Sequence, residues 1–360
     1  MEHSLDTAQM LEQLMCPAFI VQDGIVTNSN QAALQRQIKL NTNISDLICI
    51  GKDEYEIYTD GKLCLTLSIQ GITYNATVTN TESGHLFCLE SDYEDPELRA
   101  FALVAQQLRE PLAKAMVSTE LLLPNSSVRD DAEAAQHLSQ VNRSLHQLLR
   151  AVCNMSDAAQ YTNPLHANMQ TQDVSKIFDE ILEKAADLAT HAERTLNYAV
   201  PKQAIFCSAD GAKLERAILN LLSNAIKFTP KGGTINATLH HSNNRLLFTV
   251  QDSGEGANLQ ARTNMFSRFL REPGLEDGRS GIGLGLSIVR SVAAAHGGTV
   301  LIEQPNNAGV KITMTLSIKQ PADNIFRSPV RFPIDYAGGY DHCLLELSDV
   351  LPDNLFLENM

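Results

Sequence analysis

The sequence predicts a multidomain α+β protein made of an α/β unit, a pair of long helices and a second α/β unit. Before residue 90, apolar and polar residues alternate in short segments, which is typical of half-buried antiparallel strands. Between residues 95 and 159, apolar residues recur every three or four positions, as on one face of a helix. After residue 170, strand-type and helix-type segments follow one another along the chain.

Length and composition limit the possible functions. A chain of 360 residues can hold two or three domains, each with its own core. The formal net charge of −14 argues against nucleic acid or an anionic membrane surface as a partner. No apolar run approaches the roughly 18 residues that cross a bilayer, and the polar start MEHSLDTAQM lacks a signal pattern. We therefore expect no membrane span and a cytoplasmic location. The seven cysteines include no CxxC pair, which indicates reduced, structural thiols.

The first unit is predicted over residues 1–92. Two short apolar runs flank Asp23-Gly24, a dipeptide typical of hairpin turns. Further strands are expected at 63–69, 72–79 and 85–90, and a helix in the segment 30–40. Nothing in this unit forms a recognisable haem, flavin or metal site, so the sequence does not predict a ligand or signal for it.

The helical pair is predicted over residues 93–160. Asp95 and Pro96 form a start signal, because a carboxylate caps the helix and proline suits its first turn. The segment 124–127 breaks the pattern, and Ser126 or Ser127 is expected to cap the second helix. The apolar stripe of that helix consists of Ala135, Leu138, Val141, Leu145, Leu148, Val152 and Met155. Two copies of such a hairpin can pair into a four-helix bundle, which predicts a homodimer. The alternative is that the stripes pack on a neighbouring domain of the same chain.

The second α/β unit is predicted over residues 170–320. Helices are expected at 174–189, 211–228 and 285–295. Strands are expected around 195–207 and at 234–240, 245–251, 298–303 and 310–318. Residues 321–360 are rich in proline and aromatics and show no periodicity, so the role of this C-terminal tail is not predicted.

Three polar residues of the helix at 211–228 suggest a nucleotide site. Asn220 and Asn224 are four residues apart and therefore share a face. A carboxamide oxygen is a suitable ligand for Mg²⁺, and Lys227, one turn further on, can meet a phosphate oxygen. The alternative is that these polar residues merely face solvent.

The segment DSGEG at 252–256 follows a strand directly. A carboxylate at that position, Asp252, can accept a hydrogen bond from the exocyclic amine of adenine, whereas guanine presents an acceptor there. Gly254 and Gly256 would let the backbone approach a flat base closely. The motif alone is weak, because the same residues also suit an ordinary turn.

Two further segments follow. The short apolar segment MFSRF at 265–269 precedes a polar loop. Gly281, Gly283 and Gly285 then lead into a helix, where backbone amides can cradle phosphates. A GxGxG run alone is a weak signal, so its weight comes from the other three clusters.

Taken together, NLLSNAIKFTP, DSGEG, MFSRF and GIGLGL resemble the N, G1, F and G2 boxes of histidine kinases. The resemblance covers about residues 95–319 and implies the ATP-binding sandwich shared with DNA gyrase and the mismatch-repair ATPases. It implies that Asn224 ligates Mg²⁺, that Asn220 and Lys227 lie at the phosphates of ATP, and that Asp252 holds adenine. The loop 270–284 would be the ATP lid. The first unit resembles a PAS sensor domain.

One position argues against simple ATP hydrolysis. By the same resemblance, members of the superfamily that hydrolyse ATP carry a glutamate at the position of Asn220. That glutamate is the base for the attacking water. An amide cannot take a proton at neutral pH.

The same resemblance exposes a missing nucleophile. Histidine kinases carry a box of the form S-H-E-L-R-T-P-L, and this chain reads AQQLREPL at 105–112. Gln106 corresponds to the phosphate-accepting histidine, Gln107 to its neighbouring acid, and Glu110 to the threonine used in removing phosphate from a partner. An imidazole nitrogen has a free lone pair, whereas that of an amide is delocalised, so Gln106 cannot accept a phosphoryl group.

The sequence therefore predicts a histidine-kinase homologue that binds ATP and Mg²⁺ but does not autophosphorylate, with a response regulator or another histidine kinase as partner. One alternative is an active phosphotransferase that uses His137, His146 or His166, or that acts in trans. The second alternative is an interaction scaffold that no longer binds nucleotide.

Overall fold

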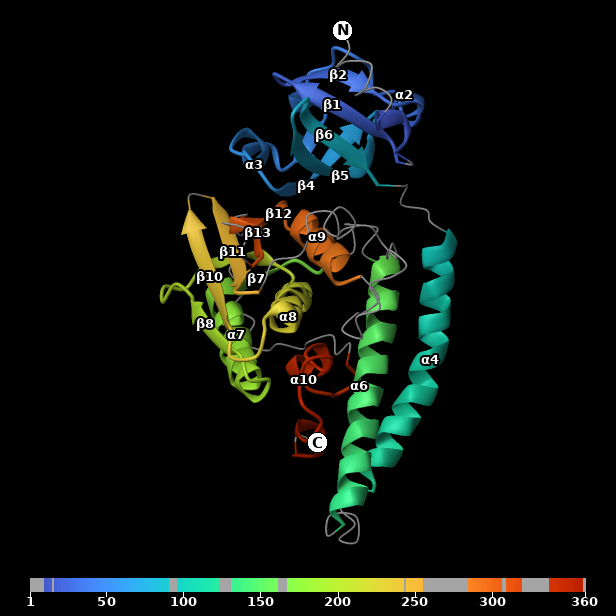
Figure 1. Ribbon diagram of the computed structural model, residues 1–360, viewed down its shortest axis with the longest axis vertical. Coiled ribbons are helices and arrows are strands. Elements are labelled where there is room, and N and C mark those ends of the chain that lie inside the picture. The colour runs from blue at the N-terminus through green and yellow to red at the C-terminus, as the bar shows by residue number, and fades with distance from the viewer. Residues whose placement is uncertain are drawn as a thin grey trace.

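The chain forms two α/β units joined by a pair of long helices (Figure 1). The computed structural model describes residues 10–14, 16–90, 96–122, 131–160, 167–242, 244–254, 284–305, 309–318 and 337–358. In Figure 1 the N-terminal unit lies at one end, and the second α/β unit lies beside the helical pair. The C-terminal residues lie between that unit and the helices.

The N-terminal unit is an antiparallel sheet flanked by short helices. Its strands are β1 (Ala18–Gln22), β2 (Ile25–Ser29), β3 (Ile48–Ile50), β4 (Lys62–Ile69), β5 (Ile72–Thr81) and β6 (Gly84–Leu89). Its helices are α2 (Gln31–Gln35), the 3-10 helix η1 (Ile44–Asp46) and α3 (Lys52–Glu56). The predicted turn is confirmed, because β1 and β2 pair antiparallel across Asp23 and Gly24, whose φ angles are 49° and 77°. The helix expected over 30–40 is shorter, since Gln37 has a left-handed φ of 64°.

Two long helices, α4 (Pro96–Glu120) and α6 (Ala132–Gln160), pack side by side along their length (Figure 1). Helix α4 begins at the proline that the sequence marks as its first turn. Neither of them, nor any other helix in the part of the chain that the structure describes, is long and apolar enough to cross a lipid bilayer.

The expected cap of the second helix is wrong. Helix α6 begins after Ser126 and Ser127, at Ala132, and the carboxylate of Asp131 accepts hydrogen bonds from the amides of Glu133 at 3.0 Å and Ala134 at 3.2 Å. Aspartate and serine cap helices about equally well, so propensity alone could not choose between them.

The apolar stripe of α6 is divided between two environments. Leu138 and Val152 are buried, and Val152 belongs to a cluster that also contains Leu345 from the C-terminal residues. Val141 and Leu148 remain 47% and 55% exposed. Part of the stripe therefore packs within the chain, and the rest forms an uncovered apolar face, so the homodimer stays a prediction.

The second α/β unit places three helices against one face of a mixed sheet. Its strands are β7 (Gln170–Asp173), β8 (Thr195–Ala199), β9 (Phe206–Ala209), β10 (Thr234–Ser242), β11 (Arg245–Asp252), β12 (Val300–Glu303) and β13 (Lys311–Ser317). Its helices are α7 (Val174–His191), α8 (Gly211–Phe228) and α9 (Gly285–Ala295). The strand order is β12-β13-β11-β10-β8, and β7 pairs with β9 in a separate ribbon. Apolar side chains of the three helices and the sheet form one continuous core.

The two α/β units share a sheet. Strand β4 pairs antiparallel with β12, which joins the N-terminal strands to those of the second unit in one eleven-stranded sheet of the described residues. Around this junction Glu90 forms an ion pair with the nearly buried Arg290, and Arg245 forms ion pairs with Asp53 and Glu54, both at 3.3 Å.

The C-terminal segment, residues 337–358, contains two short helices, α10 (His342–Glu346) and α11 (Leu355–Glu358). Asp341 caps α10 by accepting a hydrogen bond from the amide of Leu344 at 2.9 Å. Leu344 and Phe356 join the core of the second α/β unit. These helices are too short to show a period in the sequence, and we attribute them to packing rather than to local propensity.

Candidate nucleotide-binding site

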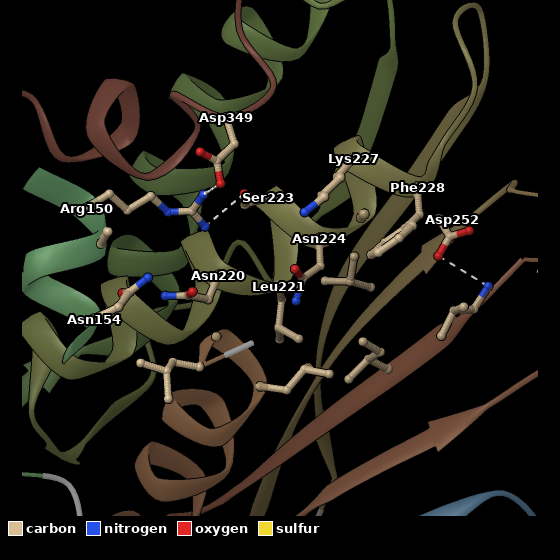
Figure 2. A pocket seen from close by; sticks show the side chains of 18 of the residues that line it. Arg150, Asn154, Asn220, Leu221, Ser223, Asn224, Lys227, Phe228, Asp252 and Asp349 are labelled. Atoms are coloured by element: carbon tan, nitrogen blue, oxygen red, sulfur yellow. Dashed lines mark hydrogen bonds and ion pairs between the residues drawn. The ribbon is translucent and has the colours of Figure 1, made fainter. Parts of the chain in front are cut away.

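Helix α8 lines a cavity of about 310 Å³ with a row of polar side chains (Figure 2). The helix is capped by Asp210, whose carboxylate accepts a hydrogen bond from the amide of Lys213 at 3.1 Å. Asn220, Asn224 and Lys227 recur at spacings of four and three and all line the cavity. The predicted shared face is therefore confirmed.

Asn220 carries an unsatisfied acceptor in this cavity. Its side chain is 1% exposed, and its Nδ2 donates to the carbonyl oxygen of Arg216 at 2.8 Å. Its Oδ1 is buried and has no hydrogen-bond partner within the described chain. Gly285 leaves room for this amide, because a Cβ there would lie 2.8 Å from Oδ1. The alternative that Asn220 merely faces solvent is wrong. A buried acceptor with no protein partner fits a ligand that brings a donor or a cation.

Asp252 lies at the opposite end of the cavity, at the end of β11 (Figure 2). It is 8% exposed, and its two carboxylate oxygens accept hydrogen bonds from the amides of Gly254 at 2.9 Å and Val310 at 3.2 Å. These two donors fix the orientation of the carboxylate. Each carboxylate oxygen has a second lone pair, so Asp252 can also accept from a ligand.

Two glycines make this end possible. A Cβ on Gly254 would lie 2.6 Å from the carbonyl oxygen of Phe228, so the chain can cross the end of α8 only without a side chain. Gly309, which the sequence analysis missed, has a φ of +66°, and a Cβ there would lie 2.0 Å from the carbonyl oxygen of Asp252. A single glycine before a strand is a common turn signal, so its role was not visible in the sequence.

The wall between the two ends is largely apolar. It is formed by Leu221, Val250, Leu286, Val310 and Ile312. A flat base with an exocyclic amine fits this arrangement, because the carboxylate can accept from the amine while aliphatic side chains contact the ring. The polar end next to Asn220 and Asn224 is suited to phosphates and a cation.

The cavity also includes residues that the sequence analysis did not select. Gln147, Arg150 and Asn154 come from α6, and Asp349 comes from the C-terminal segment. Arg150 donates to Ser223 Oγ at 3.0 Å, to Asp349 at 2.5 Å and to Glu346 at 3.1 Å. Because these residues come from segments far apart in the chain, no local spacing could have indicated them.

Six of the nine predicted nucleotide-binding residues lie together around the cavity or in the backbone that shapes it. These are Asn220, Asn224, Lys227, Asp252, Gly254 and Gly285. The other three, Gly256, Gly281 and Gly283, lie outside the described residues. The segment 265–269 also lies outside them.

The segment at 105–112, which corresponds to the histidine-containing box, does not line this cavity. Gln106, Gln107 and Glu110 are exposed on α4, and none of the three lines the cavity. Glu110 forms an exposed ion pair with Lys114 at 2.6 Å. Of the two long helices, α6 borders the cavity and α4 does not. Gln106, which stands at the position of the nucleophile, therefore does not face the predicted nucleotide.

The alternative acceptors differ in accessibility. His137 is exposed and lies 3.8 Å from Glu133. His146 is 1% exposed, lies between the rings of Tyr340 and Phe356 at centroid distances of 5.4 and 5.0 Å, and its pKa is lowered by burial. His166 lies outside the described residues. Of the two candidate acceptors that lie within the described residues, His137 and His146, only His137 is open to a phosphoryl donor.

Comparison with known proteins agrees with this geometry. Residues 209–320 match the family described as histidine kinase-, DNA gyrase B- and HSP90-like ATPase. Sensor protein KdpD of Clostridium acetobutylicum is 28% identical over 200 residues, which are 55% of this chain and 22% of that protein. The adaptive-response sensory kinase SasA of Gloeothece citriformis is 26% identical over 226 residues, 61% of this chain and 57% of the relative.

The chain is a homologue of sensor histidine kinases. It spans less than two thirds of the length of the curated relatives KdpD and SasA. The crystal structure of full-length ShkA in complex with AMPPNP is similar with a TM-score of 0.51 at 24% identity, over 62% of this chain and 46% of that one, which shows the shared fold alone.

The matched region does not contain the whole cavity of this histidine-kinase homologue. Residues 209–320 include α8, β11 and β13, and therefore Asn220, Asn224 and Asp252. Arg150 and Asp349 lie on either side of that region. The ATPase-type domain thus supplies Asn220, Asn224 and Asp252, and the rest of the chain supplies part of the rim of the cavity.

Proposed function

We propose that this histidine-kinase homologue binds Mg-ATP and uses it as a conformational ligand in two-component signalling, without transferring the phosphate to its own residue 106. The observation that carries the proposal is a cavity with a fixed carboxylate at one end and an unsatisfied amide oxygen at the other. On α4, the residue at the acceptor position is Gln106.

Each end of the cavity has a stated role in this proposal. Asp252 accepts from the exocyclic amine of adenine, Asn220 and Lys227 meet the phosphates, and Asn224 ligates Mg²⁺ through its carboxamide oxygen. The support is that all four side chains line one cavity. Bound Mg²⁺ supplies charge that offsets the phosphates.

The absence of autophosphorylation follows from chemistry and position. The amide nitrogen of Gln106 has no free lone pair, and Gln107 cannot act as the neighbouring base. Both side chains are exposed on α4 and do not line the cavity. We expect that bound nucleotide instead shifts the population of docked and released arrangements of the ATP-binding domain.

The wider architecture is also part of this proposal. Residues 1–92 would be a PAS-like sensor, 93–160 a dimerisation hairpin, 170–320 the ATP-binding domain and 321–360 a tail. The exposed Val141 and Leu148 support a homodimer through a four-helix bundle. The partner would be a response regulator or another histidine kinase, in the cytoplasm.

Calorimetric titration with Mg-ATP tests nucleotide binding. We expect saturable heat from the wild-type chain, none with Mg-GTP, and none from Asp252→Ala, because this substitution removes the acceptor for adenine. Asp179→Ala, an exposed carboxylate on α7, is the matched control and should titrate like the wild type. A wild-type chain that gives no heat would favour the scaffold alternative and overturn the proposal.

Incubation with γ-labelled ATP tests the missing nucleophile. The proposal expects no acid-labile label on the chain. If label appears, the proposal that the chain does not autophosphorylate would be wrong. The substitutions His137→Gln, His146→Gln and His166→Gln, made singly, would then locate the acceptor.

A further inference from the structure

The C-terminal segment lies between the helical pair and the second α/β unit and contacts both (Figure 1). The face of α6 that meets it carries polar residues at helical spacing, and these are Ser139, Asn142, Arg143, Gln147 and Arg150. Each of them donates a hydrogen bond to a residue between 346 and 356. On its other side the segment contributes Leu344, Leu347 and Phe356 to the core that contains α7 and α8. The segment therefore fastens the ATP-binding domain to α6.

The contact between α6 and the segment reaches the cavity at Arg150. Three acceptors surround its guanidinium group: Glu346 at 3.1 Å, Asp349 at 2.5 Å and Ser223 Oγ at 3.0 Å. Figure 2 shows Arg150 and Asp349 at the side of the cavity opposite Asp252, with Asn220 and Asn224 between. Arg150 thus lies where the far end of a polyphosphate would lie.

The two carboxylates on Arg150 differ in how easily each can leave. The side chain of Glu346 is fully buried, whereas that of Asp349 is 30% exposed. A carboxylate that can move into water when it gives up its cation is released at a lower free-energy cost than one that stays buried as an uncompensated charge. Of the two carboxylates, Asp349 is therefore the one that an incoming anion would displace.

The chemistry of the exchange matches the residues. A guanidinium group presents a planar fork of donors that fits carboxylate and phosphate equally well. Ser223, which Arg150 contacts, lies on α8 between Asn220 and Asn224, the residues proposed for phosphate and Mg²⁺. A phosphate held by those amides would reach the same guanidinium that Asp349 occupies.

We propose that Arg150 is a ligand of the terminal phosphate of ATP, and that Asp349 holds its place until the nucleotide binds. This inference rests on the proposed function. It makes the number of phosphates the signal: ATP releases Asp349 and loosens the C-terminal segment from the cavity rim, whereas ADP leaves the segment in place. A residue outside the ATPase-type domain would then report the nucleotide state to α6.

The test compares Mg-ATP with Mg-ADP on the full chain. For Arg150→Gln we expect the dissociation constant for ATP to rise about tenfold, as for one charged hydrogen bond, and that for ADP to stay within about twofold. For Asp349→Asn we expect ATP to bind several-fold tighter and ADP to be unchanged, because a competing anion is removed. Asp353→Asn is the matched control. Asp353 lies in the same C-terminal segment as Asp349 and pairs with Arg143 of α6, but it does not line the cavity.

Hydrogen exchange supplies a second readout. We expect ATP, and not ADP, to increase exchange in residues 341–351 of the wild type, and the increase to be absent in Arg150→Gln. If Arg150→Gln melts at a much lower temperature, Asp349→Asn alone decides the matter.

The outcomes separate the two proposals. A wild-type chain that binds neither nucleotide overturns the proposed function and this inference with it. If ATP and ADP both bind and respond equally to the substitutions, or if Asp349→Asn leaves ATP affinity unchanged, only this inference is overturned.

Discussion

Glu346 holds the C-terminal segment, the helical pair and the ATP-binding domain together at one point. Its carboxylate is fully buried and forms ion pairs with Arg150 of α6 and with Arg216 of α8. Arg216 is 2% exposed and also pairs with Asp157 at 2.5 Å. Glu346→Gln keeps the shape of the side chain and removes its charge, so it isolates the electrostatic contribution of this contact.

The expected effect is large because the partners are buried. Removing one member of a buried ion pair costs about 3 kcal/mol, since the remaining charges stay out of water without compensation. After the substitution, Asp349 and Asp157 remain as the carboxylates paired with Arg150 and Arg216 among the described residues, and Asp349 is 30% exposed. By contrast, Arg143 and Asp353 are 28% and 36% exposed, so Asp353→Asn should cost at most about 1 kcal/mol.

Hydrogen exchange of peptides within residues 342–356 measures the difference directly, because it reports local opening rather than global unfolding. About 3 kcal/mol corresponds to an opening equilibrium on the order of a hundredfold larger, against roughly fivefold for the Asp353→Asn control. If the two variants exchange equally fast, or if Glu346→Gln exchanges like the wild type, then the segment is not fastened through this buried charge and the reasoning is wrong.

Three other perturbations have expected outcomes. Burial lowers the pKa of His146 below its ordinary 6.5, so as the pH falls through about 6.5 the unfolded chain binds a proton that the folded chain does not, and the free energy of unfolding decreases. The opening constant of the C-terminal segment, which is its exchange rate divided by the intrinsic rate at the same pH, should therefore increase between about pH 7 and pH 5.5. The substitution His146→Gln should reduce that increase. Glu90→Gln leaves the nearly buried Arg290 without its carboxylate and should increase exchange in β12 more than in β10, and equal exchange would show that this ion pair does not hold the β4–β12 junction. Leu148→Glu places a charge on the uncovered face of α6 and should convert a dimer to a monomer in sedimentation velocity, whereas a monomeric wild type would contradict the proposed bundle.

The sequence by itself determined the elements whose pattern is local. The spacing of Asn220, Asn224 and Lys227 places them on one side of a helix, because 3.6 residues complete a turn, and all three line the cavity. Asp252 was selected because it directly follows an alternating strand, and β11 ends at that residue. The turn at Asp23-Gly24 followed from the need for a left-handed backbone in a two-residue hairpin.

Only the tertiary structure decided which distant segments meet. Arg150 and Asp349 are separated by 199 positions and form one rim of the cavity, although neither stands out in its own neighbourhood. The pairing of β4 with β12 was equally invisible, because any exposed strand edge offers the same backbone donors and acceptors. Local periodicity fixes which face of a helix or strand is apolar, but hydrogen bonds and ion pairs between such faces depend on how the units pack.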